Sequence, residues 1–118
     1  MPREWLIKWN SSAARLIEQL ETLVSFVCVI WKTNNIGHRT ERYRNHPSLE
    51  GGVGDRLNDI TAELATAHGL VLADVRPLTI AESASTHEKA KGIPNFYHDY
   101  DHGKLAGFLM ERWKERCE

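Results

Sequence analysis

The chain has 118 residues, of which 42% are hydrophobic and 26% are charged, and its formal net charge is −1. At this length about two-thirds of the unfolded chain's surface becomes buried on folding, so neither a disulfide nor a metal is needed for stability. The nearly neutral charge argues against a general attraction to nucleic acids or anionic membranes. We therefore expect one globular domain over residues 1–118, with no required cofactor.

The two cysteines, Cys28 and Cys117, stand far apart in the sequence. Their spacing matches neither a disulfide framework nor a zinc motif, so a reducing, cytoplasmic location is expected. The apolar run 23–31 is too short to span a bilayer and follows acidic residues instead of a basic segment. The sequence therefore predicts neither a membrane span nor a signal peptide.

Residues 11–33 carry the strongest periodic pattern. At 100° per residue, the apolar side chains fall in one stripe about 140° wide, as in a helix with one face toward a core. The stripe consists of Ala13, Leu16, Leu20, Leu23, Val24, Val27, Ile30 and Trp31. Because no glycine, proline or asparagine interrupts this period, we predict one long helix over 11–33.

One alternative divides this segment. Residues 24–31 are rich in β-branched and aromatic side chains, so a shorter helix ending near Thr22 followed by a buried strand would give an α/β fold. In the single-helix interpretation, Phe26 and Val29 lie outside the main stripe and need a second packing partner. The helix would then be either central in the domain or paired with a second copy, and a homodimer is our hypothesis.

The segment 34–54 shows no clear periodicity and contains a proline and three glycines. A connection of this length is typically functional or flexible. Its first half is basic through Arg39, Arg42 and Arg44, which would suit a phosphate or a nucleic-acid backbone, with Tyr43 as a stacking surface. The alternative is an ordinary solvated loop.

A second helix is expected over 55–68, ending at Gly69, because Leu57, Ile60 and Leu64 fall on one face. Residues 60–78 also match the spacing of a helix-turn-helix. Pro77 would lie inside its second helix, however, and the segment has few side chains that read bases. An extended stretch over 70–76 is therefore favoured.

Two more helices complete the prediction. Thr79 and Glu82 have the spacing of a capping box, which predicts a minor helix over 80–91. The last helix is expected over 96–116, with Leu105, Leu109 and Trp113 facing inward. The expected fold is mainly α: a small bundle of three long helices, over 11–33, 55–68 and 96–116, plus the minor helix.

Potential metal ligands gather near the start of the last helix: His98, Asp99, Asp101 and His102. Histidines four residues apart on a helix project from the same face and can share one cation. His98, His102 and Asp99 are thus a candidate site for a divalent metal. In two alternatives, His87 joins Asp99, Asp101 and His102 in metal-free acid–base catalysis, or an aspartate merely caps the helix.

The run His98-Asp99-Tyr100-Asp101-His102-Gly103 resembles the metal-binding motif of cyclic-nucleotide phosphodiesterases and, more loosely, the His-Asp pair of the HD phosphohydrolases. The resemblance implies a helical fold, a divalent metal held by His98 and Asp99, and a bridging water that attacks phosphorus. Those families also need an upstream histidine motif and a downstream aspartate. The chain shows neither, and we assign it to no family.

Three functions follow as hypotheses. The first is a non-enzymatic interaction or regulatory protein that acts as a homodimer. The second is a metal-dependent hydrolase that uses His98, Asp99, Asp101 and His102 as catalytic residues. The third is a nucleic-acid-binding protein that uses Arg39, Arg42 and Arg44.

Overall fold

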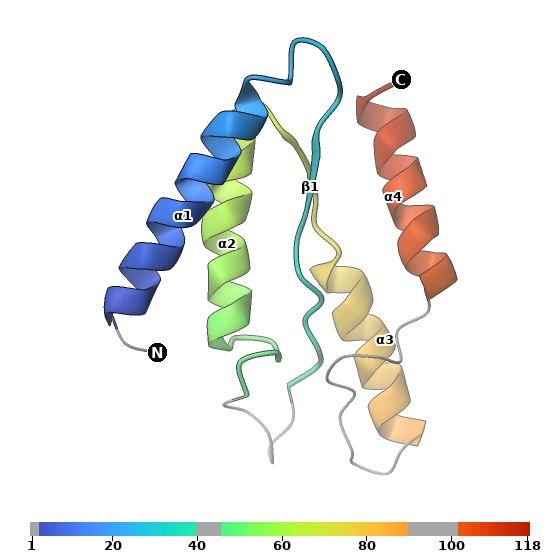
Figure 1. The fold of residues 1–118 in the computed structure, drawn as a ribbon. Helices are drawn as coiled ribbons and strands as arrows, with labels where there is room; N and C mark the ends of the chain where they lie inside the picture. The colour runs from blue at the N-terminus through green and yellow to red at the C-terminus, as the bar shows by residue number, and fades with distance from the viewer. Residues whose placement is uncertain (1–2, 40–45, 90–101) are drawn as a thin grey trace.

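The computed structural model describes residues 3–39, 46–89 and 102–118 (Figure 1). In these ranges the helices are α1 (Arg3–Glu21), α2 (Val53–Ala67), α3 (Arg76–Lys89) and α4 (His102–Arg116), and the strands are β1 (Ile30–Lys32) and β2 (Val71–Ala73). The strands pair in parallel, with Trp31 opposite Leu72. Figure 1 shows α1 and α2 on one side of the strands and α3 and α4 on the other. The described chain is mainly helical in content, but its helices surround a small sheet.

The prediction of one helix over 11–33 is wrong. α1 ends at Glu21, and the Thr22 hydroxyl donates a hydrogen bond of 2.6 Å to the Gln19 carbonyl at the last turn. The chain then turns and enters β1, whose β-branched and aromatic residues pair with β2. Tertiary pairing therefore overrides the helical period. The alternative of a shorter helix followed by a strand describes this region, although the strand covers only Ile30–Lys32.

Two apolar clusters pack the helices against the strands and the segments that follow them. The first cluster centres on Ile17, Ala65 and Leu70, with Leu20, Val29, Trp31 and Leu64 packed against it. The second joins Val75 and Leu105, with Leu78 and Phe108 beside them. Ile17 is fully buried, whereas Leu16, which the longer stripe placed inward, is 47% exposed. The inward face of α1 is thus rotated from the predicted one, because residues 23–31 do not belong to that helix.

α2 agrees with the predicted helix over 55–68 within two residues, and Gly69 ends it with φ of 80°. In this left-handed conformation the Leu70 N–H reaches the Ala65 carbonyl at 2.9 Å, which closes the helix. The buried row on α2 is Asn58, Thr61 and Ala65. Small and polar side chains face the rest of the domain there, while half-buried Leu64 packs in the first apolar cluster.

α3 begins at Arg76 and not at the predicted capping box. Pro77 fits this start, because the first turn of a helix needs no N–H from that residue. Thr79 is fully buried inside the helix and bonds the segment after β1 instead of capping an end. The extended stretch predicted over 70–76 contains β2, so no second helix of a helix-turn-helix follows α2. Three long helices packed as a bundle are not observed.

None of the helices in the described part of the chain has the length and apolar character needed to cross a membrane.

Candidate functional site

The predicted metal and catalytic cluster falls largely outside the described residues. His98, Asp99 and Asp101 lie in the undescribed range 90–101. His102 is the first residue of α4, and its side chain is likewise not described. The geometry of this cluster therefore remains a prediction.

The basic segment is described only in part. Arg39 is exposed and its guanidinium lies beside Gly51, whereas Arg42 and Arg44 fall in the undescribed range 40–45. The patch proposed to bind phosphate or nucleic acid therefore stays a prediction.

The histidines with described side chains occupy separate places. The His38 backbone N–H donates to the Ser83 hydroxyl, His46 Nδ1 accepts from the Ser48 N–H, and His68 pairs with Glu21 where α1 and α2 end. Across the ranges 3–39, 46–89 and 102–118, no three His, Cys, Asp or Glu side chains gather closely enough to hold a metal ion.

A charged cluster centred on Arg76 lies just beyond the carboxyl end of β2. The Arg76 guanidinium donates to both carboxylate oxygens of Asp74, at 2.8 and 2.9 Å. Its remaining nitrogen reaches Asp55 at 2.9 Å and Asp59 at 2.6 Å, both on α2. One guanidinium thus joins the end of β2, the start of α3 and the first half of α2.

The charged cluster shifts the pKa values of Asp74 and Arg76 in opposite directions. Hydrogen bonds from the Arg76 side chain lower the pKa of Asp74, and this effect outweighs the opposing effect of partial burial. The same partners raise the pKa of Arg76, with Asp74 as the largest cause. The Arg76 side chain is 13% exposed, whereas Asp59 is 67% exposed. We therefore assign most of the stabilisation to the bidentate pair with Asp74.

Buried hydroxyl and amide groups fix the segment that follows β1. The Asn58 side chain bonds both backbone groups of Asn34, accepting at 2.9 Å and donating at 3.3 Å. The Thr79 hydroxyl accepts from the Ile36 N–H at 3.1 Å and donates to the Ile36 carbonyl at 2.8 Å. Residues 33–38 are therefore held between α2 and α3 by side chains in place of a neighbouring strand.

Thr33 connects this segment to the charged cluster. Its hydroxyl accepts from the Val75 N–H at 3.0 Å and donates to Asp74 at 3.2 Å. A shallow hollow of about 410 Å³ opens beside the cluster, lined by acidic residues, Arg76, Pro77 and Ile80. All three guanidinium nitrogens of Arg76 already have protein partners. This arrangement indicates a structural role, in which Arg76 holds the end of β2 and the start of α3 against α2.

Sequence reasoning did not identify this cluster, although a signal was present. Polar residues follow each extended stretch directly: Thr33 and Asn34 after β1, and Asp74 and Arg76 after β2. The carboxyl ends of parallel strands lie at one edge of a sheet, so these residues must meet once the strands are recognised. The prediction of a continuous helix over 11–33 concealed the first strand.

The opposite edge of β1 carries no partner strand in the described sheet. The Val71 N–H bonds the Val29 carbonyl and the Thr33 N–H bonds the Ala73 carbonyl. This parallel register directs the N–H and C=O groups of Ile30 and Lys32 away from β2. Within residues 3–39, 46–89 and 102–118 the sheet has two strands, so these four groups form an open edge there, defined here as the outer backbone edge of β1.

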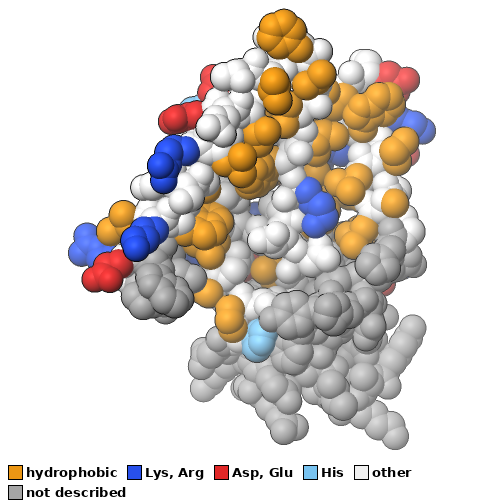
Figure 2. Space-filling view, in the orientation of Figure 1, with side chains coloured by type: hydrophobic (Ala, Val, Ile, Leu, Met, Phe, Trp, Pro, Cys, Tyr) orange, Lys and Arg blue, Asp and Glu red, His pale blue; other side chains and the backbone are white. Residues whose placement is uncertain are grey.

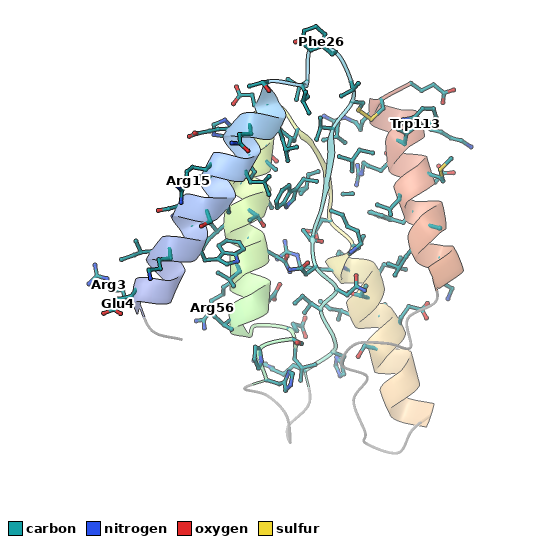
Figure 3. The ribbon with its side chains drawn as sticks, viewed as in Figure 1. Arg3, Glu4, Arg15, Phe26, Arg56 and Trp113 are labelled. Atoms are coloured by element: carbon teal, nitrogen blue, oxygen red, sulfur yellow. A yellow bond between two sulfur atoms is a disulfide. The ribbon has the colours of Figure 1, made fainter. Side chains whose placement is uncertain are left out.

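Exposed apolar side chains lie on the turn that leads into β1 and on α4. On the α1–β1 turn they are Leu23, Val24, Phe26 and Val27, and on α4 they are Met110 and Trp113. Phe26 is 83% exposed. Figure 2 shows hydrophobic side chains gathered on the face that carries β1, and Figure 3 places Phe26 at the tip of the turn and Trp113 across from it on α4. We call these six residues, together with the open edge, the apolar face.

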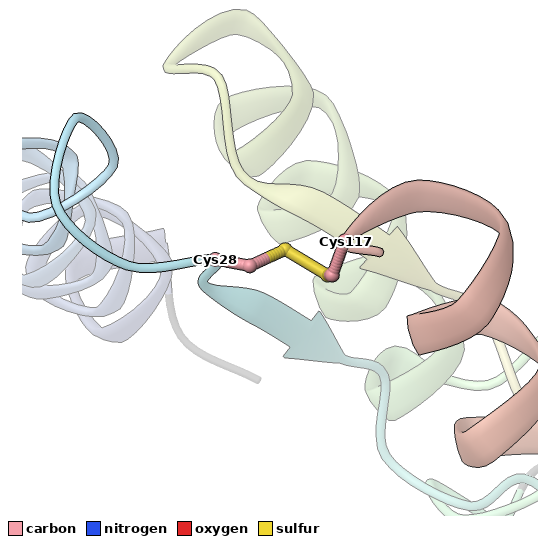
Figure 4. Close-up of a disulfide and its surroundings, with 2 residues drawn as sticks. All are labelled: Cys28 and Cys117. Atoms are coloured by element: carbon pink, nitrogen blue, oxygen red, sulfur yellow. A yellow bond between two sulfur atoms is a disulfide. The ribbon is translucent and has the colours of Figure 1, made fainter.

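A disulfide joins Cys28, which precedes β1, to Cys117 at the end of α4 (Figure 4). The expectation that the sequence holds no disulfide is therefore wrong. Spacing alone gave no indication of the pair, because the parallel sheet and α4 bring the two Cα atoms to 5.6 Å only in the folded chain. Peptide mapping without reductant should yield one pair of peptides linked through Cys28 and Cys117. The intact mass of the unreduced chain should be lower by two hydrogens than that of the reduced chain.

Comparisons of the chain with protein families, characterised proteins and solved structures found no match.

Proposed function

We propose that this protein is a non-enzymatic interaction protein that acts as a homodimer, with the apolar face as its contact surface. The open edge of β1 is the observation that supports this proposal. Unpaired strand edges readily accept another strand, because their N–H and C=O groups already lie in ladder geometry. The exposed apolar side chains of the turn before β1 and of α4 add the burial that a stable interface needs.

The surface area is consistent with a second copy. The chain exposes 7863 Å². A compact folded monomer of 13.5 kDa exposes about 6,500 Å², so the excess is about 1,300 Å². The radius of gyration of 15.6 Å also exceeds the value of about 13.5 Å for a compact domain of this length.

The open edge is self-complementary about a two-fold axis at Ile30. Two copies of β1 would pair in antiparallel fashion, with Ile30 opposite its counterpart and Lys32 opposite Cys28. This register keeps the two Lys32 side chains from facing each other, which would be destabilising. Lys32 already turns toward its own chain, donating to the Thr33 carbonyl at 2.9 Å and to Asn35 at 3.1 Å. The result would be a four-stranded sheet.

Sedimentation velocity over a range of protein concentrations tests the dimer. The native chain should sediment as a dimer at micromolar concentration, and Phe26→Glu should raise the dimer Kd at least about tenfold, because it places a charge in a desolvated contact. Ile30→Pro should do the same, since it removes an outward N–H without removing a bond to β2.

Ile7→Glu is the matched control, because Ile7 is 57% exposed on α1 but belongs to the end of that helix remote from the α1–β1 turn. Its Kd should equal that of the native chain. A native chain that stays monomeric at these concentrations, or variants that all dimerise equally, would rule out the proposal.

We propose a hydrolase as the second candidate, because α4 begins at the carboxyl side of the sheet. Cys117 at the end of α4 is bonded to Cys28 before β1, so the helix runs antiparallel to the strand and His102 lies toward the strand's carboxyl end. Lys104 in the first turn pairs with Glu82 of α3. Ligands of open α/β sheets bind at this end. In this candidate His98, Asp99 and His102 hold a divalent metal, and Asp101 assists.

Hydrolysis of p-nitrophenyl phosphate and p-nitrophenyl acetate, with Mn²⁺ or with EDTA, tests this candidate. Metal-dependent turnover should fall about a hundredfold in His102→Ala. It should stay unchanged in His68→Ala, because His68 lies at the end of α2, where it pairs with Glu21. Turnover that EDTA does not affect would indicate metal-free acid–base catalysis. No turnover of either substrate would rule out the hydrolase.

We also propose a cytoplasmic location. A disulfide in that compartment is usually transient and redox-sensing.

A further inference from the structure

The Cys28–Cys117 disulfide is accessible from solvent. Cys28 is exposed and Cys117 is half-buried, and both line a shallow hollow of about 360 Å³ that also includes Phe26, Val71 and Arg116. Figure 4 shows the bond bridging the segment before β1 and the last turn of α4. Exposed disulfides are the reducible, regulatory class, because a thiolate can reach a sulfur atom.

The most buried described side chain of α4 lies in the first half of the helix. Leu105 is 8% exposed and packs against Val75, with Phe108 beside that pair. In the second half, Met110 and Trp113 are 54% and 41% exposed. The disulfide therefore supplies the covalent attachment of the half that has the weaker packing.

The same half of α4 forms one side of the apolar face. Met110 and Trp113 belong to the apolar face through α4, and the disulfide holds the end of that helix beside the start of β1. Cutting the S–S bond would free that end to move away from the strand. The state of the two cysteines is thus physically coupled to the surface proposed for dimerisation.

We propose that the Cys28–Cys117 disulfide is a redox switch that sets the affinity of the homodimer, an inference that rests on the proposed function. A dithiol reductant supplies the reaction. In the dissociated chain one of its thiolates attacks the exposed Cys28 sulfur, the S–S bond breaks, and Cys117 leaves as a thiolate near Arg116 and then takes a proton. The second thiol of the reductant resolves the mixed disulfide, so the reductant is oxidised and both cysteines end as thiols.

Two measurements test the switch, each on the full chain with and without dithiothreitol. Hydrogen–deuterium exchange reports whether residues 110–117 are released, and sedimentation velocity reports the dimer Kd. Reduction should raise exchange in 110–117 while leaving α2 unchanged, and it should raise the Kd at least about tenfold. Reoxidation with oxidised glutathione should restore both values.

The double variant Cys28→Ser, Cys117→Ser is the control, because it should show the reduced-state exchange and Kd whatever the reductant. Unchanged exchange in 110–117 on reduction would show that the disulfide does not hold the end of α4, and this would overturn the proposal. Raised exchange with an unchanged Kd would overturn the coupling but leave the dimer intact. An oxidised chain that is monomeric throughout would instead overturn the proposed function, and the exchange result would still decide whether the disulfide holds α4.

Discussion

Replacing Arg76 with methionine should lower the free energy of unfolding by about 2–4 kcal/mol. Methionine keeps much of the side-chain volume but removes every donor to Asp74, Asp55 and Asp59. The carboxylates would then face one another without a cation. We place the effect somewhat below that of a fully buried pair because Asp59 is largely exposed and solvent screens its share.

The pH dependence of stability should change sign in this variant. In the native chain the pKa of Asp74 is lowered, so its contribution is present above about pH 4 and is lost as the pH falls further. Without Arg76, partial burial and the neighbouring carboxylates raise the pKa of Asp74 in the folded state. Arg76→Met should therefore become more stable as the pH falls from 7 toward about 4.5, where the native chain changes little.

Urea denaturation followed by circular dichroism, at one protein concentration and several pH values, measures both effects. Arg56→Met is the matched control, since Arg56 is exposed on the first turns of α2, as Figure 3 shows. It should unfold like the native chain at every pH. Equal stabilities of the two variants at pH 7 would show that the charged cluster does not hold the fold.

Thr79→Val should be comparably destabilising, by about 2–4 kcal/mol. Valine has nearly the same shape, but it removes the hydroxyl that bonds both the N–H and the C=O of Ile36. Thr79 is fully buried and Ile36 is 2% exposed, so water cannot replace those bonds. The cost is that of leaving two backbone groups without partners.

A second variant at Thr79 and a control at Thr66 separate the effect of the hydroxyl from that of the methyl group. Thr79→Ser keeps the hydrogen bonds and should retain most of the stability, whereas Thr66→Val alters an exposed threonine on α2 and should change little. Urea unfolding of the three proteins at pH 7 provides the comparison. If Thr79→Ser loses as much as Thr79→Val, packing of the methyl group and not the hydrogen bonds accounts for the effect.

The sequence predicted best where local signals and tertiary packing agree. α2 was found from its apolar period, and its end from Gly69, because the left-handed conformation there suits glycine. The extended stretch around β2 was found because Pro77 does not fit the interior of a helix that would begin near residue 70. These features depend on a few neighbouring residues.

The features that sequence reasoning missed depend on partners distant in the chain. Residues 24–31 fit a helical period as well as a strand, and only pairing of Ile30 with Val71 decides between them. The Arg76 cluster and the Cys28–Cys117 bond likewise require β1 and β2 to be adjacent first. The predicted site at His98 and Asp99 lies outside the described residues and stays a prediction.

The Cys28–Cys117 bond also makes most of the polypeptide a closed covalent ring. A protease that cuts once inside the ring, for instance in the connection between β1 and α2, opens the ring but releases no fragment. The nicked protein would keep its mass apart from one added water and would run as one species on a non-reducing gel. Its two pieces would separate only after reduction, so the backbone continuity of this protein has to be judged under reducing conditions.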